Sequence, residues 1–116
     1  MVLLEGCADP YSHKVVRSSM GAVFRTKVVQ STWAAVQAAC KAAGIPVAVT
    51  ALSERAKDIR SADLTQMAVV IGSEGRGVRQ EILGSADAEL IIPMNPRCES
   101  LNAAIAATIC MWQMKK

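Results

Sequence analysis

Two short apolar runs, each ended abruptly by a loop of small and polar residues, constrain the fold of this chain more than any other feature. The first run covers residues 67–71 and is followed by the loop GSEGRG at residues 72–77. The second covers residues 90–92 and is followed by a Pro- and Asn-containing loop at residues 93–100. In an open parallel sheet, ligands bind in the crevice beyond the carboxyl ends of the strands. We therefore expect the two loops to lie side by side and to form one binding site.

Strand-like and helix-like patterns alternate along the 116 residues, with short connections between them. The expected strands are residues 2–4, 27–29, 47–52, 67–71 and 90–92. The expected helices are residues 12–20, a segment from Ser31 or Thr32 to Gly44, residues 78–83 and residues 101–114. This alternation predicts an α/β fold with a mostly parallel sheet flanked by helices, in a single domain spanning residues 1–116. The polar segment 53–63 is expected to be an exposed loop, with a helical turn as an open alternative for part of it.

Composition argues against several classes of protein. Apolar residues make up 52% of the chain, but no run of about 18 consecutive apolar residues is present, as a membrane-spanning helix would require. The N-terminus does not resemble a secretory signal, so we expect a cytoplasmic protein. The four cysteines form no C-x-x-C pair, which favours reduced thiols over a disulfide framework or a metal site. The net charge of +3 is compatible with a polyanionic partner without demanding one.

The loop at residues 72–77 contains three glycines, which allow a ligand to approach the backbone closely. It lacks the Lys-Ser or Lys-Thr pair of a P-loop and does not have the G-x-G-x-x-G spacing of dinucleotide-binding proteins. ATP and NAD are therefore poorly supported as ligands. A tight structural turn is the alternative interpretation of the glycines. Glu74 lies between two of them, and we expect its carboxylate to be partly enclosed, with an exposed loop carboxylate as the alternative.

The second loop leads into the apolar helix expected at residues 101–114. Ser100 is a candidate N-cap for this helix. Arg97 is a candidate for contact with phosphate, because a guanidinium group pairs well with phosphate oxygens, although a solvated loop arginine is an equal alternative. The helix is apolar on nearly all sides. We therefore expect it to be buried on more than one side and to support dimer formation.

Three stretches of the chain resemble a known family. The loop GSEGRG and the segment IIPMNPRCESLNAAIAA are similar to the second and third signature motifs of the SpoU-type (TrmH-family) RNA ribose 2′-O-methyltransferases, which belong to the SPOUT class. The two motifs occur in the family's order and at its spacing. The stretch DPYSHKVVRSSMGAVFRTKVV resembles the segment between the family's first and second motifs. The resemblance covers nearly the whole chain and implies a C-terminal trefoil knot.

The resemblance implies a homodimeric enzyme that transfers a methyl group from S-adenosylmethionine to a ribose 2′-hydroxyl of rRNA or tRNA. By position, the cofactor would contact Thr50, Gly72, Ile92, Met94 and Leu101. The residues at the reacting centre would be Glu74, Ser100 and Asn102. Arg17 and Arg25 fall in the family-like stretch and would contact the RNA, whereas Arg97 lies where the second loop departs from the family and is a candidate by its chemistry alone. No metal is required, because the cofactor carries the reactive methyl group.

The chain departs from the family in one respect that bears on activity. The family's first motif, whose arginine is assigned to RNA binding or to activation of the ribose hydroxyl, would precede Met1, so we expect an N-terminally incomplete domain. An alternative hypothesis is therefore a non-catalytic fragment that dimerises and binds cofactor or RNA. A weaker third hypothesis is a generic α/β nucleotide-binding protein. Binding of S-adenosylmethionine without methyl transfer would support the non-catalytic fragment.

Overall fold

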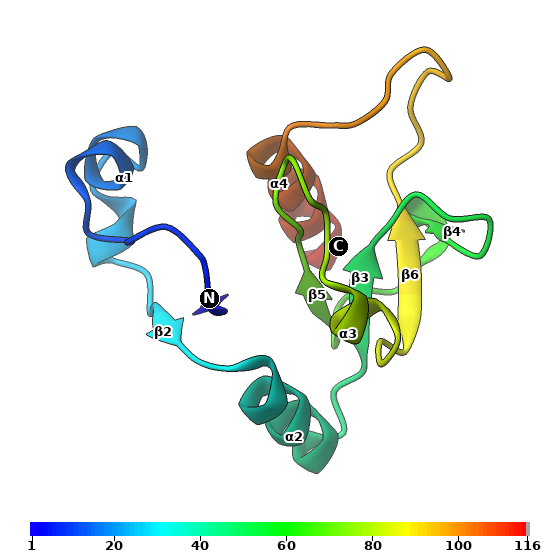
Figure 1. The fold of residues 1–116 in the computed structure, drawn as a ribbon, viewed down its shortest axis with the longest axis horizontal. Helices are drawn as coiled ribbons and strands as arrows, with labels where there is room; N and C mark the ends of the chain where they lie inside the picture. The colour runs from blue at the N-terminus through cyan, green and yellow to red at the C-terminus, as the bar shows by residue number, and fades with distance from the viewer. Residues whose placement is uncertain (116) are drawn as a thin grey trace. The chain divides into compact units, whose positions relative to one another are not determined.

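The computed structural model describes residues 1–115, which form two compact units (Figure 1). The first unit is Met1–Ala39 and the second begins at Cys40. Each unit contains its own parallel sheet, of two strands in the first and four in the second. The predicted α/β fold, with parallel strands and flanking helices, is therefore confirmed.

The first unit is held together by a short parallel strand pair and local caps. Its elements before the long helix are β1 (Val2–Leu3), α1 (His13–Ser18), the 3-10 helix η1 (Ala22–Phe24) and β2 (Val29–Gln30). β1 and β2 pair in register, Val2 with Val29. The Ser12 hydroxyl accepts a hydrogen bond from the Val15 amide at 3.3 Å, which confirms Ser12 as the N-cap of α1. The second strand begins two residues later than predicted.

Helix α2 (Trp33–Ala43) runs from the end of the first unit into the start of the second. The Thr32 hydroxyl accepts a hydrogen bond from the Ala35 amide at 3.2 Å, so Thr32 rather than Ser31 provides the side-chain cap. Gly44 follows the helix with a φ of 68°, a conformation that favours glycine and ends helices. Both boundaries agree with the sequence prediction.

The second unit contains a four-stranded parallel sheet in the order β4-β6-β3-β5. Its strands are β3 (Val47–Thr50), β4 (Lys57–Asp58), β5 (Ala68–Val70) and β6 (Ala88–Ile91). Its helices after α2 are η2 (Ile59–Ser61), α3 (Gln80–Leu83) and α4 (Ala103–Met114). The central strand β3 is buried over its first three residues, as expected for a parallel sheet covered on both faces.

A helical turn is present within residues 53–63 as η2, but the prediction that the segment is an exposed loop is wrong. Lys57 and Asp58 form the edge strand β4, which pairs with β6. The following residue, Ile59, begins η2 and is only 3% exposed. Ile59, with Ala62 packed against the same cluster, thus anchors this polar segment to the core.

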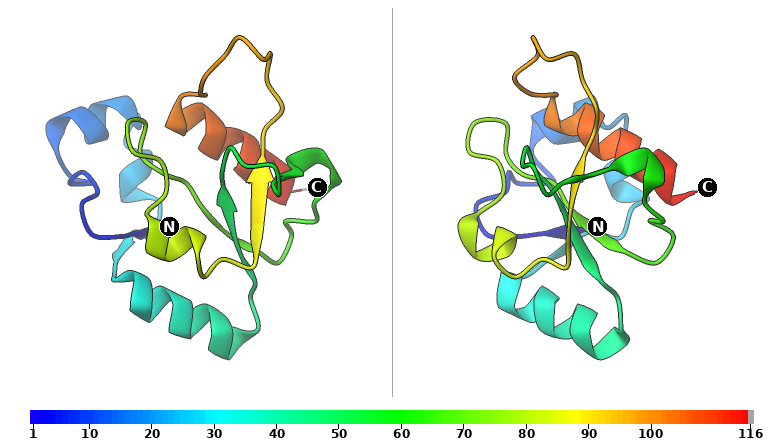
Figure 2. Two further views of the ribbon diagram at one scale, coloured as in Figure 1. Left: turned by 45° about the vertical axis from the view of Figure 1, so that its right-hand side comes forward. Right: turned by 90° about the vertical axis from the view of Figure 1, so that its right-hand side faces the viewer.

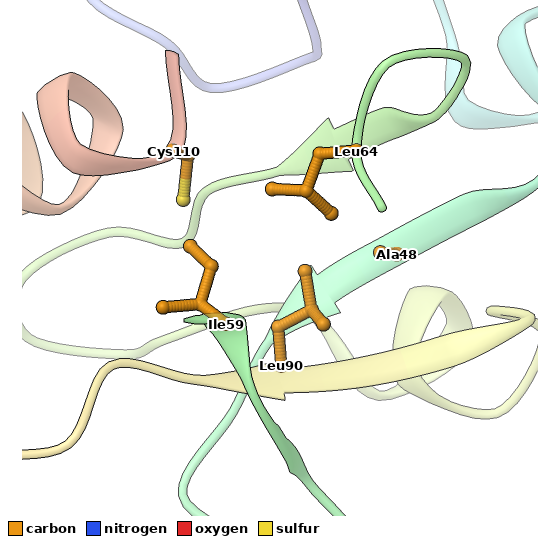
Figure 3. Packing of buried hydrophobic residues seen from close by; sticks show 5 residues of the cluster. All are labelled: Ala48, Ile59, Leu64, Leu90 and Cys110. Atoms are coloured by element: carbon orange, nitrogen blue, oxygen red, sulfur yellow. The ribbon is translucent and has the colours of Figure 1, made fainter. Parts of the chain in front are cut away.

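The core of the second unit joins the sheet to η2 and α4. The cluster consists of Ala48, Ile59, Leu64, Leu90 and Cys110. Figure 3 shows the Cys110 side chain of α4 pointing toward Ile59. These residues come from five separate segments, so the cluster fixes α4 against the sheet.

Within the single chain, the outer side of α4 is exposed, so the predicted burial on more than one side stays a prediction that depends on a partner. Cys110 is buried, but Ile105, Met111 and Trp112 are 51%, 58% and 75% exposed. Residues 105 and 112 are seven positions apart and therefore lie on one side of the helix, with residue 111 beside them.

No helix within residues 1–115 is long and apolar enough to cross a membrane.

Candidate functional site

A cavity of about 670 Å³ lies beyond the carboxyl ends of β3, β5 and β6 in the second unit. Its volume falls within the range of about 300–1,000 Å³ that is typical of small-molecule sites. Residues of the 72–77 loop and of the segment 92–101 both line it. Figure 2 shows the second segment, in orange, leaving β6 and turning back to the start of α4. The two loops that end the apolar runs therefore share one cavity.

The glycine loop is a closed turn. The amide of Ser73 donates to the Gly77 carbonyl at 3.1 Å, and the amide of Gly77 donates to the Ser73 carbonyl at 2.9 Å. Gly77 has a φ of 66°, which favours glycine. The loop folds back so closely that a Cβ on Gly72 would lie 2.3 Å from the carbonyl carbon of Gly77. Gly72 is thus required by the packing of the turn itself.

Asn102 connects the two loops. Its Nδ2 donates a hydrogen bond to Oε1 of Glu74 at 2.8 Å. Its Oδ1 accepts hydrogen bonds from the amides of Ala104, at 3.0 Å, and Ile105, at 3.2 Å. Asn102 is therefore the N-cap of α4, and the prediction that Ser100 caps this helix is wrong. The amide oxygen of Asn102 thus caps the helix, and the amide nitrogen donates to Glu74.

Of the three residues predicted for the reacting centre, Glu74 and Ser100 line the cavity, and Asn102 bonds to Glu74. Glu74 and Ser100 are both exposed, so the expected partial enclosure of the Glu74 carboxylate is wrong. The structure brings all three residues together at the opening between the loops. Their roles in a reaction stay predictions.

All five residues predicted to contact a cofactor line this same cavity. They are Thr50, Gly72, Ile92, Met94 and Leu101. Each is partly buried. The Thr50 hydroxyl donates to the Val70 carbonyl at 3.4 Å, which links the ends of two strands at the cavity floor.

The three arginines predicted to contact RNA are all exposed, and they are divided between the two units. Arg17 lies in the last turn of α1 and Arg25 is the C-cap of η1, both in the first unit. Arg97 lies in a turn in which its amide donates to Oδ1 of Asn95 at 2.9 Å. Arg97 does not line the cavity.

The sequence analysis missed one polar group of the cavity, formed by Ser53, Arg55 and Glu89. The Ser53 hydroxyl donates to the Glu89 carboxylate, and Nη2 of Arg55 lies 3.5 Å from Oε1 of Glu89. The Glu89 side chain is 14% exposed, whereas that of Arg55 is 87% exposed. A sequence signal existed, because Glu89 is the single charge in the run AELII.

The lining combines aliphatic walls with a few polar groups, as small-molecule sites usually do. Ile71, Leu90 and Ile92 supply apolar surface, and Thr50 and Ser100 supply hydroxyl groups. This combination suits a ligand with a flat apolar portion and several hydrogen-bonding groups, such as an adenosyl compound. Within residues 1–115, no group of three or more His, Cys, Asp or Glu residues could hold a metal ion.

This chain is a parallel α/β protein with a loop-lined cavity beyond the carboxyl ends of its strands, which is the place where proteins of this class bind ligands. A model of the SpoU rRNA Methylase family matches residues 1–112. The chain therefore belongs to the SpoU rRNA methylase family.

Among its relatives, the chain is 33% identical to the 23S rRNA (guanosine(2553)-2′-O)-methyltransferase of Bacillus subtilis, over 99% of this chain and 46% of the relative. It is 39% identical to a tRNA (guanosine(18)-2′-O)-methyltransferase of Thermus thermophilus, over 66% of this chain and 40% of the relative. The structure of an AdoMet-bound rRNA methyltransferase from Sinorhizobium meliloti is similar with a TM-score of 0.88 and 32% identity, over 98% of this chain and 44% of that one. The chain thus spans less than half the length of these relatives.

Proposed function

We propose that this chain is the methyltransferase domain of an S-adenosylmethionine-dependent RNA 2′-O-methyltransferase that acts on rRNA or tRNA. The observation that carries the proposal is the single cavity shared by the two motif loops, which the hydrogen bond between Asn102 and Glu74 joins. The names of the relatives, which include rRNA and tRNA 2′-O-methyltransferases, support the reaction and the substrate class. Because these relatives modify rRNA and tRNA, we also propose that the protein works in the cytoplasm.

In this proposal the cavity holds the methyl donor. S-adenosylmethionine, when bound, supplies an electrophilic methyl group on a sulfonium. Ile92, Met94 and Leu101 provide aliphatic contacts from one loop, and Thr50 and Gly72 contribute from the other two strand ends. The cavity volume of about 670 Å³ is large enough for a ligand of this size. An AdoMet-bound structure among the similar proteins supports this choice of ligand.

The reacting centre is assigned to Glu74, Ser100 and Asn102. Transfer of the methyl group to a ribose hydroxyl requires that the oxygen be aligned with the methyl carbon and that its proton be removed. Ser100 and Glu74 line the cavity opening, where an RNA ribose can enter from solvent. Asn102 fixes the Glu74 carboxylate through its 2.8 Å hydrogen bond. Arg17, Arg25 and Arg97, all exposed, are assigned to the RNA phosphates.

The exposed side of α4 supports a homodimer. Ile105, Met111 and Trp112 expose apolar surface on a helix that lies next to the cavity, since Ala103 and Ala106 line it. Pairing of two copies through this side would remove that surface from water. A dimer would also place a second chain beside the donor site.

We further propose that the whole chain forms one SPOUT domain whose C-terminal part is threaded into a trefoil knot. The match of the family model to residues 1–112, across both units, supports the single domain. The close contact between the 72–77 loop and the start of α4 supports the threaded path. A single cooperative unfolding transition, followed by fluorescence and by circular dichroism, is the expected result.

Two measurements on the same preparation test the proposed function. Titration calorimetry with S-adenosylmethionine is expected to show one site per chain, and transfer of a labelled methyl group is then measured on tRNA and on rRNA. Binding with transfer supports the enzyme. Binding without transfer supports the non-catalytic cofactor-binding module, and tight binding of ATP or NAD with no binding of the methyl donor would refute both.

A further inference from the structure

The cavity lining contains one carboxylate, that of Glu89, to which the proposed reaction assigns no role. Four charged residues line the cavity: Arg55, Glu74, Arg76 and Glu89. Glu89 is the only one of the four that is not exposed to solvent. It lies in strand β6, opposite Val49 of β3, and not on a loop. Its position is therefore fixed by the sheet.

The charge of Glu89 is only partly compensated. The Ser53 hydroxyl donates to its carboxylate, and this bond leaves the negative charge in place. The guanidinium of Arg55 is 3.5 Å away, but the Arg55 side chain is 87% exposed. Water screens an exposed charge far more than a charge in the protein interior. The cavity is thus expected to have a negative potential at this wall.

We propose that Glu89 makes the cavity select a cationic sulfonium over the corresponding neutral thioether. This inference rests on the proposed methyl-donor site and deepens it. S-adenosylmethionine and its demethylated product, S-adenosylhomocysteine, share the same adenosyl and amino-acid groups. They differ by one methyl group and one positive charge. A carboxylate that is only 14% exposed therefore stabilises the donor more than the product, and its attraction is lost when the methyl group leaves.

The selectivity has a consequence for turnover. A site that bound both compounds equally would be blocked by its own product as the product accumulated. The reaction removes the positive charge of the sulfonium, with which Glu89 interacts. The affinity of the site for S-adenosylhomocysteine is therefore lower than for the donor, and no movement of the protein is needed. Glu89 therefore acts as a specificity-determining residue rather than as a group that takes part in proton transfer.

Calorimetry with the full chain and the two purified compounds tests the proposal, and the quantity of interest is the ratio of the two dissociation constants. Glu89→Gln keeps an acceptor for the Ser53 hydroxyl but removes the charge. This variant is expected to reduce the preference for S-adenosylmethionine by about threefold to tenfold. Arg55→Ala removes the compensating cation and is expected to increase the preference. The matched control is Glu81→Gln, because Glu81 is an exposed carboxylate of α3 that does not line the cavity.

The possible outcomes separate this proposal from the proposed function. If Glu89→Gln weakens both compounds equally, Glu89 only positions the 51–56 segment, and charge selection is refuted. An unchanged ratio in both Glu89→Gln and Arg55→Ala refutes it as well. If the wild-type chain binds neither compound, the methyl-donor site itself is refuted, and this inference falls with it. Opposite shifts of the ratio in the two variants, with no shift in the control, support charge selection.

Discussion

Replacing Gly72 by alanine tests how the cavity is built. The added Cβ would lie 2.3 Å from the Gly77 carbonyl carbon, 2.5 Å from the Val78 amide nitrogen and 2.7 Å from the Gly77 carbonyl oxygen. Non-bonded carbon atoms prefer separations of about 3.5–4.0 Å, so the facing backbone must move by about 1 Å. All three atoms belong to the backbone and cannot rotate away. We therefore expect a cost near the upper end of the range for overpacking, about 3 kcal/mol.

The assay is thermal and urea unfolding followed by circular dichroism. A loss of about 3 kcal/mol corresponds to a decrease in Tm of roughly 10 °C for a chain of this size. Gly75→Ala is the matched control, because a Cβ at Gly75 meets no atom within 4 Å. We expect that control to unfold within about 0.5 kcal/mol of the wild type. Equal stabilities of Gly72→Ala and Gly75→Ala would show that the loop does not fold back on Gly72 as the structure describes.

Three further predictions concern α4. Asn102→Ala is expected to lose about 0.5–2 kcal/mol of stability through the lost cap, together with methyl transfer. Asn102→Asp keeps the cap oxygen but sets a second carboxylate against that of Glu74, so it should recover only part of the stability and none of the activity. Trp112→Glu, which places a charge on the exposed side of the helix, is expected to convert a dimer into a monomer in sedimentation, and an unchanged mass would argue against pairing through α4. Burial raises the pKa of the Cys110 thiol, so this group should resist a thiol reagent at pH 8 until the protein unfolds, whereas the exposed Cys98 reacts at once. Rapid labelling of both would contradict the packing of α4.

Local patterns were sufficient to predict the central elements of the fold. β3, β5 and β6 are apolar runs bounded by turn residues, and the carboxyl ends of parallel strands must lie at one edge. The caps at Ser12 and Thr32 and the stop at Gly44 follow from side-chain and backbone chemistry within one turn of a helix. The shared cavity follows from these local features and the strand order.

The errors arose where contacts between distant segments decide the result. Lys57 and Asp58 form β4 only because β6 offers a free edge, and no local pattern marks such a two-residue strand. Ser100 and Asn102 are both good N-caps by residue type, and the choice of Asn102 coincides with its hydrogen bond to Glu74, 28 residues away. The sequence could not predict which side of α4 is exposed. The helix is apolar on all sides, so its pattern does not distinguish the side that faces the core.

The two bonds made by Asn102 tie the start of α4 to the geometry of the cavity opening. An amide group is planar, so its oxygen and nitrogen turn together. A ligand that drew Glu74 away and rotated this amide would also remove the N-cap of the helix. The same helix carries Cys110 into the core, so a disturbance at the opening is transmitted to the packing beneath the sheet. The position of the cavity opening therefore depends on how α4 packs in the core. A substitution near Cys110 that stabilises this packing should also reduce the motion of the opening, although it makes no contact there.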